Sequence, residues 1–203
     1  MVAKVTPLTG VRIFRRGLAA LALKTKKPIV LVGMMGAGKS AVGRTLAQML
    51  AVPFLDSDHE IERAAAMTIA EVFARDGEDF FRARESEVLA RLLATGPCVI
   101  STGGGAFLAE ANRRMIHEQG VSVWLRADLE LLWERVRHKS TRPLLRTPDP
   151  KGTLTALYEQ RTGIYALADL VVDAHPAYTL GDMARQVLRV LRTRPDVIED
   201  VAE

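Results

Sequence analysis

The segment from Gly33 to Ser40 has the spacing of a phosphate-binding loop. It reads Gly-Met-Met-Gly-Ala-Gly-Lys-Ser, which fits the pattern G-x-x-x-x-G-K-[ST], and it follows the apolar run at residues 29–32. Glycines let consecutive backbone N–H groups turn inward around a phosphate, and the N-terminus of a following helix adds partial positive charge. Lys39 can then reach the β- and γ-phosphates of a nucleotide, and Ser40 can ligate Mg²⁺. The alternative is a glycine-rich turn with a solvated lysine.

Two carboxylates, Asp56 and Asp58, follow the next predicted strand at residues 52–55. In an open α/β sheet, ligands bind beyond the carboxyl ends of the strands. One carboxylate there can help to hold Mg²⁺, often through water, and the other can accept a proton from an attacking hydroxyl. The alternative is helix capping by Asp58 or Ser57, since both residue types are favoured caps. The nearby phosphate loop favours the catalytic interpretation.

After a predicted strand at residues 98–101 come three successive glycines, Gly103, Gly104 and Gly105. Such a run lets a ligand approach the backbone closely. Many phosphate-loop enzymes carry an aspartate at the end of this strand, where this chain has Ser101 and Thr102. We therefore expect Asp56 to supply the carboxylate for magnesium.

Arginine is frequent in this chain, and spacing alone does not single out Arg82 or Arg161. Arg142 differs because it lies in a polar, proline-containing stretch at residues 138–152. A stretch of this kind inside a compact fold is either a functional lid or a disordered link. As part of a lid, Arg142 can close over a transferring phosphoryl group and stabilise its charge.

The elements that must position these residues alternate along the chain. Short apolar strands are predicted at residues 29–32, 52–55, 98–101, 121–125 and 170–172. Helices are predicted after the phosphate loop, at 59–76 in two pieces, around 88–93, and at 109–118, 128–137 and 179–192. This alternation indicates a three-layer α/β/α fold with a five-stranded parallel sheet.

Length and composition are those of a soluble single domain. The chain has 203 residues, of which 48% are hydrophobic and 26% charged. The only cysteine, Cys98, permits no internal disulfide, and no apolar run is long enough to span a membrane, so we expect a cytoplasmic protein without a membrane partner.

Positive charge is concentrated at the start of the chain. Residues 1–27 hold seven basic residues and no acid, so removing them from the formal +4 leaves −3 for the rest. We expect a flexible basic extension at 1–27, although the segment also has features of a signal or transit peptide. The main domain is expected at 28–192, with a polar tail at 193–203.

Taken in order, these motifs resemble the shikimate kinase family over residues 28–192. The resemblance rests on the phosphate loop, Asp56-Ser57-Asp58, Gly77-Glu78 with Phe81-Arg82, the triple glycine, Arg142-Pro143-Leu144-Leu145, and Arg161 with Tyr165. It implies a P-loop fold of the nucleoside-monophosphate-kinase type with a mobile lid. It also implies transfer of the γ-phosphate of MgATP to the 3-hydroxyl of shikimate, on the route to chorismate and the aromatic amino acids.

The resemblance also implies roles for single residues. It places Asp58 at the shikimate hydroxyls as the base, Lys39 and Arg142 at the transferring phosphate, and Ser40 and Asp56 at Mg²⁺. The shikimate site would consist of Asp58, Arg82, Gly103, Gly104, Gly105 and Arg161. The ATP site would consist of Gly36, Ala37, Gly38, Lys39, Ser40, Ala41, Arg135 and Arg142.

Two other functions remain open from the sequence. One is a kinase of another small hydroxy acid, such as gluconate, on the same fold. The other is a nucleotide-binding regulator that contacts nucleic acid through the basic extension. The −3 of the main domain argues against nucleic acid along its surface, and seven charges alone support only weak, salt-sensitive contact. We therefore expect a monomeric enzyme with ATP and shikimate as partners and no nucleic acid.

Overall fold

The computed structural model describes residues 23–138 and 143–201. Within them, five parallel strands form one sheet in the order β3-β4-β2-β5-β6. The strands are β2 (Ile29–Val32), β3 (Phe54–Asp56), β4 (Val99–Ser101), β5 (Val121–Arg126) and β6 (Leu170–Asp173). The five predicted strands are confirmed, each within two residues of its expected bounds.

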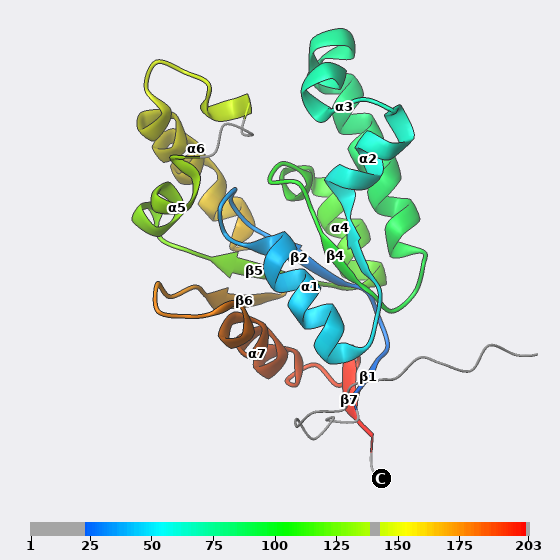
Figure 1. The fold of residues 1–203 in the computed structure, drawn as a ribbon. Helices are drawn as coiled ribbons and strands as arrows, with labels where there is room; N and C mark the ends of the chain where they lie inside the picture. Colours follow the sequence, from blue (N-terminus) through cyan, green and yellow to red (C-terminus); the bar gives the residue numbers. More distant parts are fainter. Residues whose placement is uncertain (1–22, 139–142, 202–203) are drawn as a thin grey trace, which may run out of the picture.

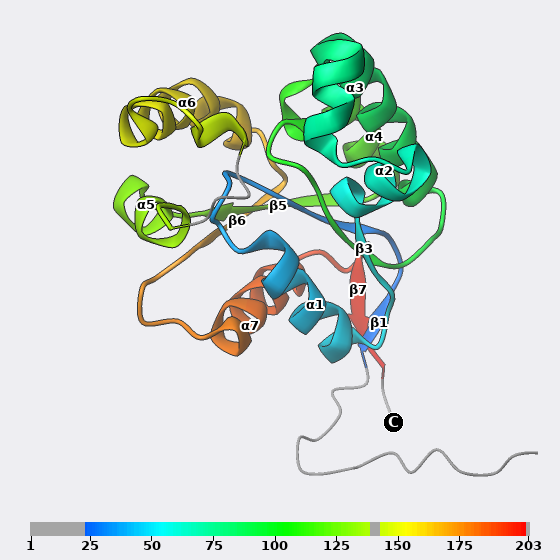
Figure 2. The ribbon, with the colours of Figure 1, turned by 45° about the horizontal axis from the view of Figure 1, so that its top comes forward.

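Helices cover both faces of this sheet. They are α1 (Lys39–Leu50), α2 (Ser57–Ala65), α3 (Ile69–Leu93), α4 (Glu110–Gln119), α5 (Leu129–Val136), α6 (Pro150–Tyr165) and α7 (Leu180–Leu191). Two 3₁₀ turns, η1 (Ala106–Leu108) and η2 (Pro143–Leu145), complete the set. Helices α1 and α7 lie side by side on one face, and α3 and α4 lie on the other (Figures 1 and 2). The predicted three-layer architecture is confirmed.

The central strand β2 lies in the middle of the hydrophobic core. Its four residues, Ile-Val-Leu-Val, are completely buried and pair with β4 on one side and β5 on the other. A strand buried on both faces is expected to be apolar throughout, because helices cover it above and below. Burial of β2 fixes the point at which the phosphate loop leaves the sheet.

The helical region after β3 has the predicted division into two pieces up to residue 76, followed by a further helical segment to Leu93. Helix α2 ends at Ala65, and α3 begins after Thr68, whose side chain forms a capping box with Glu71. The third helix then continues to Leu93 through a kink at Gly77, where φ is +83°. Glycine adopts this left-handed conformation without the steric cost that a Cβ would add. The Gly77-Glu78 motif therefore lies at a break between two helical segments of α3, one before Gly77 and one after it.

Helix α6 was not predicted, and the expected lid at 138–152 is too long at its C-terminal end. Residues 143–145 form η2 and α6 already begins at Pro150. Asp149 caps this helix by accepting a hydrogen bond from the backbone N–H of Gly152, at 2.9 Å. An aspartate cap followed by proline in the first turn is a recognised helix start. Residues 139–142 of the expected lid, Arg142 included, lie outside the described residues.

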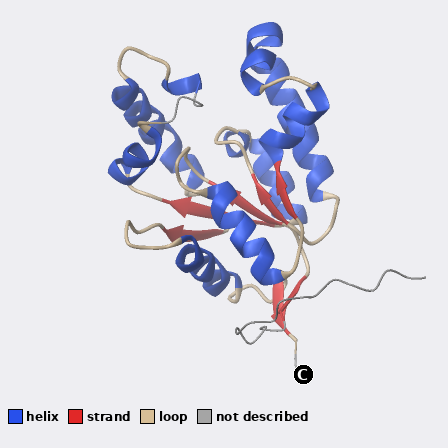
Figure 3. Ribbon diagram, in the orientation of Figure 1, coloured by secondary structure: helices blue, strands red, loops and turns tan. Residues whose placement is uncertain are grey.

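Both expected terminal segments need correction. Strand β1 (Leu23–Thr25) pairs antiparallel with β7 (Ile198–Asp200) in a separate two-stranded ribbon. Figure 3 shows this ribbon as two short strands beside the five-stranded sheet. The flexible extension therefore does not reach residue 27, and the polar tail expected at 193–203 contains strand β7. Short polar segments paired across the whole chain leave no local pattern in the sequence. The rest of the expected extension, residues 1–22, lies outside the described residues.

None of the helices in the described ranges is long and apolar enough to cross a membrane.

Candidate active site

The phosphate loop connects the buried end of β2 to the first turn of α1. Gly36 and Gly38 have φ values of +85° and +95°, in the region that disfavours residues with a Cβ. A Cβ on Gly36 would also lie 2.7 Å from Cγ1 of Val136. The Lys39 ammonium donates to the carbonyl oxygens of Gly33 at 2.7 Å and Met34 at 3.0 Å, and so lies across the mouth of the loop. This arrangement can hold a phosphate chain.

Ser40 and Asp56 meet beside this loop, as predicted. The Ser40 hydroxyl donates to Oδ2 of Asp56 at 2.8 Å and lies 3.1 Å from the hydroxyl of Ser101. Asp56 Oδ1 accepts from the backbone N–H of Asp58 at 3.2 Å, so Asp56 also caps α2. The N-terminal cap of α2 is therefore Asp56, and neither Ser57 nor Asp58, the two capping candidates in the sequence, takes that position. Oxygen donors of this kind suit Mg²⁺, which usually takes few protein ligands and keeps phosphate and water in the remaining positions.

Asp58 and Glu85 meet at the first residue of the triple glycine. A Cβ on Gly103 would lie 2.6 Å from Oδ1 of Asp58 and 2.9 Å from Oε1 of Glu85. Only glycine leaves room for both carboxylates here. The Gly103 backbone N–H donates to the Ser57 hydroxyl at 3.1 Å, which holds the glycine loop against the start of α2.

Glu85 is a site residue that the sequence did not reveal. Its side chain is 2% exposed and accepts from Nη1 of Arg82 at 2.7 Å. Burial raises the pKa of Glu85, and the ion pair with Arg82 opposes that shift in part. Its second oxygen, Oε1, is buried and has no hydrogen-bond partner among the described residues. The i+3 spacing from Arg82 is the only sequence signal, and it is common on helix surfaces.

The two arginines that spacing did not single out lie next to this carboxylate. Arg82 also binds Glu78, and a Cβ on Gly105 would overlap its guanidinium group. Arg161 is 8% exposed, and its Nε is buried without a hydrogen-bond partner in the described part of the chain. Its charge lowers the pKa of Glu85, so Arg161 and Arg82 belong to one electrostatic cluster. Two arginines beside buried carboxylates can bind a carboxylate ligand.

Tyr165 connects α6 to the glycine loop. Its hydroxyl donates a hydrogen bond to the carbonyl oxygen of Gly104, and its ring stacks on those of Phe107 and Trp124. Burial raises the pKa of Tyr165 to about 12, so the phenol stays protonated and remains a donor. Gly104 in turn faces the phosphate loop, because a Cβ on it would lie 3.9 Å from the backbone nitrogen of Met35. The glycine loop therefore lies between the phosphate loop and the arginine cluster.

A cavity of about 420 Å³ opens over the phosphate loop. Predicted residues in its lining are Gly36, Ala37, Gly38, Lys39, Ser40, Ala41, Asp56, Asp58, Gly104 and Arg135. Arg135 also donates to the carbonyl oxygen of Gly36 at 3.3 Å. The rest of the lining lies outside the predicted site. It consists of Met35, Val42, Arg44, Ser101 and Thr102 near the phosphate loop, and of Tyr178, Thr179, Leu180 and Met183 at the start of α7. In the helix predicted at 179–192, the periodicity of Leu180 and Met183 indicated a core face and carried no signal for a ligand.

Comparison with known proteins identifies the family. The family model described as shikimate kinase matches residues 35–192. A shikimate kinase from Cereibacter sphaeroides is 67% identical over 176 residues, which cover 87% of this chain and 88% of that protein. The chain belongs to the shikimate kinase family. A second family member, from Ruegeria pomeroyi, is 64% identical over 183 residues, or 90% of this chain and 92% of that protein.

Solved structures give the same result. The chain resembles a shikimate kinase from Acinetobacter baumannii in complex with shikimate, with a TM-score of 0.78 and 38% identity over 82% of this chain and 93% of that one. A gluconokinase from Sinorhizobium meliloti has a TM-score of 0.56 at 20% identity over 82% of this chain and 92% of that chain. The second likeness shows a shared fold only. Membership of the shikimate kinase family accounts for the order of the motifs and for the P-loop architecture.

Proposed function

We propose that this protein transfers the γ-phosphate of MgATP to the 3-hydroxyl of shikimate, yielding shikimate 3-phosphate and ADP. The observation that carries the proposal is the position of Asp58. This residue lines the cavity over the phosphate loop and also meets the arginine-bearing cluster at Gly103. A base in that position faces the nucleotide on one side and a carboxylate-bearing acceptor on the other.

The acceptor is proposed to bind with its carboxylate at Arg82 and Arg161. Bidentate guanidinium contacts fix the orientation of a planar carboxylate and place the rest of the ring. Backbone groups of Gly103, Gly104 and Gly105 then contact the ring where side chains would block it. The orphaned Oε1 of Glu85 and Nε of Arg161 are buried polar atoms of this region. A bound polar ligand removes the cost of leaving such atoms without partners.

Asp58 is proposed as the base. The 3-hydroxyl oxygen attacks the γ-phosphorus, the bond from that phosphorus to the bridging oxygen of ADP breaks, and the hydroxyl proton passes to the Asp58 carboxylate. Phosphoryl transfer of this kind depends mainly on positioning and on stabilising charge. Lys39 lies at the phosphate loop to supply that charge, and Arg142 is proposed to add to it from the lid.

Mg²⁺ is proposed to bind at Ser40 and Asp56, whose oxygens already lie together beside the phosphate loop. When bound, the ion neutralises negative charge on the β- and γ-phosphates. At the other end of the nucleotide, Arg135 is proposed to pack on the base. We also propose that the protein acts as a monomer in the cytoplasm without a nucleic-acid partner. Sedimentation at micromolar concentration tests the monomer.

The test is a coupled ADP-release assay with shikimate, gluconate and no acceptor, with the product identified by mass. We expect turnover with shikimate, at least about a hundredfold lower turnover with gluconate, and loss of Mg²⁺-dependent turnover in the presence of EDTA. The preference follows from the rejection of ligands that leave buried polar groups unpaired. Equal or better turnover of gluconate would overturn the assignment of the acceptor.

A further inference from the structure

Two short segments at opposite ends of the sequence close on each other, and nothing in the proposed reaction uses them. Residues 23–27 contain β1 and lead into β2, and residues 194–200 follow α7 and contain β7. We call these two segments together the terminal clasp. A two-stranded ribbon is at best marginally stable alone in water, so its other contacts must hold it in place.

Backbone and buried apolar contacts join the two segments. Leu23 pairs with Asp200 and Thr25 with Ile198, and the backbone N–H of Lys26 donates to the carbonyl oxygen of Val197 at 2.7 Å. Val197 is completely buried and Ile198 is 2% exposed, so β7 is anchored in the core.

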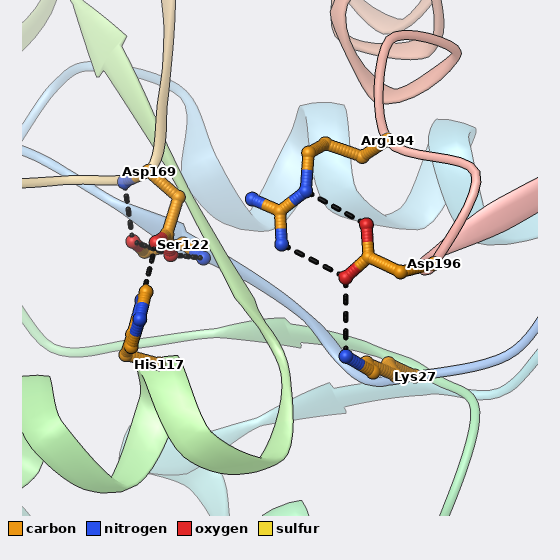
Figure 4. Close-up of polar contacts among 6 residues, drawn as sticks. All are labelled: Lys27, His117, Ser122, Asp169, Arg194 and Asp196. Carbon is orange, nitrogen blue, oxygen red and sulfur yellow. Dashed lines mark hydrogen bonds and ion pairs between the residues drawn. The ribbon is translucent and has the colours of Figure 1, made fainter.

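Ion pairs complete the clasp. The Lys26 ammonium lies 2.5 Å from Glu199 and donates to the carbonyl oxygen of Pro195 at 3.1 Å. Lys27 binds Asp196 at 3.1 Å, and the Arg194 guanidinium holds the same carboxylate with bonds of 2.8 and 2.9 Å (Figure 4). The Arg194 bonds are the main reason that the pKa of Asp196 lies far below its usual value.

The clasp joins the far ends of two elements that meet again at the nucleotide cavity. Lys27 lies two residues before β2, and β2 leads directly into the phosphate loop. Arg194 lies three residues after α7, and the first turn of α7 forms the opposite wall of the cavity with Thr179, Leu180 and Met183. Helix α7 packs against α1, which starts at the phosphate loop (Figure 2). The cavity is therefore at one end of this pair of elements and the clasp at the other.

We propose that the terminal clasp is a positioning element for the nucleotide: it fixes α7 relative to the phosphate loop and so sets the affinity of the cavity for ATP and ADP. The inference rests on the proposed kinase function for the identity of the ligand. Opening the clasp turns the end of α7 into a free terminus, and free termini are mobile. If the wall is correctly placed in only a fraction of the molecules, the apparent Kd equals the intrinsic Kd divided by that fraction.

A positioning element and a merely stabilising element can be told apart by the substrates that they affect. An element that positions the nucleotide affects the binding of ATP and ADP but not that of shikimate. The shikimate cluster draws its side chains from α2, α3 and α6 and takes none from α7 or the clasp. Opening the clasp should therefore raise the KM for ATP and the Kd for ADP and leave the KM for shikimate nearly unchanged. A general loss of stability would lower the fraction of active protein. It would leave the KM for ATP, the Kd for ADP and the KM for shikimate unchanged.

The experiment uses the full chain and four clasp variants. A chain ending at Arg194 lacks β7. Lys26→Glu and Glu199→Lys each reverse one charge of the same ion pair, and combining them restores the attraction with opposite polarity. Glu110→Lys is the matched control, because it breaks an exposed ion pair with Arg114 at 2.7 Å on α4, away from the cavity. ADP affinity is measured by calorimetry without shikimate, and both KM values by the coupled assay.

We expect the truncation to weaken ADP binding and raise the KM for ATP about tenfold, which corresponds to about 1.4 kcal/mol. Each charge reversal should weaken ADP binding about threefold, and the double variant should recover most of that loss. The KM for shikimate should stay within about twofold throughout, and Glu110→Lys should change none of these values.

Unchanged ADP affinity in the truncated chain, or equal rises of both KM values, would overturn the proposal. If the truncated chain fails to fold, the charge reversals decide: wild-type ADP affinity in both, with a lowered Tm, assigns the clasp to stability alone. The calorimetric test requires no acceptor. If shikimate were the wrong acceptor for the wild-type protein, the assay would show it and the ADP result would still stand.

Discussion

The two ends of the central sheet differ in whether their charged side chains have hydrogen-bond partners for every polar atom. At the carboxyl ends of the strands, Glu85 and Arg161 are buried, and each has a polar atom without a hydrogen-bond partner among the described residues. At the amino ends, Asp169 is satisfied on both oxygens. It accepts from the hydroxyl and the backbone N–H of Ser122 at 2.6 and 2.8 Å, and it lies 2.7 Å from Nδ1 of His117 (Figure 4).

This difference has a physical meaning. An unsatisfied buried charge costs free energy, and a fold keeps it only where a ligand or another function compensates. The amino-end network joins α4, β5 and the start of β6 and needs nothing further. We infer that the Glu85–Arg161 region at the carboxyl end is left incomplete for a ligand, whereas the Asp169 network at the amino end serves stability. Substitutions at the two ends should separate catalysis from stability.

The largest effect is expected from Asp58→Asn at the carboxyl end. The variant keeps the shape of the side chain but cannot take the proton, so kcat should fall by about 10³-fold, within the usual range for a general base. Binding of ADP, measured by calorimetry, should stay within about twofold of the wild-type value. Asp79→Asn on the exposed face of α3 is the control. A near-normal kcat for Asp58→Asn would remove this residue from the role of base.

Arg82→Ala should have the next largest effect. It removes the proposed charge-assisted contact to the acceptor carboxylate and leaves Glu85 without its ion pair, so the KM for shikimate should rise about a hundredfold. The KM for ATP should change by less than about threefold. Arg84→Ala is the matched control, since Arg84 pairs with Glu87 on the same helix and its side chain is 50% exposed. Equal rises of both KM values would contradict a specific role at the acceptor.

At the amino end, Asp169→Asn should affect stability and spare catalysis. The amide cannot accept from all three donors, which should cost about 1–3 kcal/mol. For a chain of this size that lowers the Tm by roughly 2–12 °C. Calorimetry measures the shift, while kcat should stay within about twofold. The comparison variant is Asp173→Asn, which breaks a mostly exposed pair with Arg126 and should cost much less. A loss of kcat at full stability would mean that this end also serves the reaction.

The smallest expected effect concerns the pH dependence of stability. As the pH rises, the contributions of Asp169 and Glu85 to stability should change with opposite signs. Although burial opposes them, hydrogen bonds from Ser122 lower the pKa of Asp169, so Asp169 contributes stability above about pH 3.8 and loses it as the pH falls through the lowered pKa. Burial raises the pKa of Glu85, so the folded state loses stability as the pH rises from about 4.5 through the raised pKa.

Denaturation of the wild type, Asp169→Asn and Glu85→Gln between about pH 2 and pH 7, which includes the range below pH 3.8 where the Asp169 contribution changes, measures these opposite trends. From acid to neutral pH, the advantage of the wild type over Asp169→Asn should grow, while its advantage over Glu85→Gln should shrink. A tenfold difference in proton affinity between the folded and unfolded states corresponds to about 1.4 kcal/mol of stability. Trends of the same sign in both variants would break the comparison between the two ends.

What the sequence predicted depended on how local the signal was. The phosphate loop, the Asp56–Asp58 pair and the triple glycine are contiguous motifs, and the structure brings all three together around one cavity and its neighbouring cluster. The strands were predictable because β2 and its neighbours are short, apolar and separated by turn residues. Helix α6 was missed because Pro150 and Gly152 suggested a loop, although Asp149 before a proline is a helix start.

The remaining features depend on contacts between distant residues. Glu85 is an ordinary charged residue by spacing, and only its burial beside Asp58 distinguishes it. The cavity wall at the start of α7 has a core-like pattern, since Leu180 and Met183 fit the apolar face of the helix. The terminal clasp explains part of the basic start of the chain, because Lys24, Lys26 and Lys27 all lie near acidic residues that follow α7. A net-charge count could not show this pairing.

The clasp has a consequence for how the protein is made. Lys26 and Pro195, which it joins, are separated by 169 positions in the sequence. During synthesis, β1 leaves the ribosome well before β7, because the whole five-stranded sheet lies between them in the sequence. Domains fold as their chain emerges, so the sheet and the phosphate loop have time to form before β7 is available. The α7 wall of the nucleotide cavity is then fixed only after β7 has emerged and paired with β1.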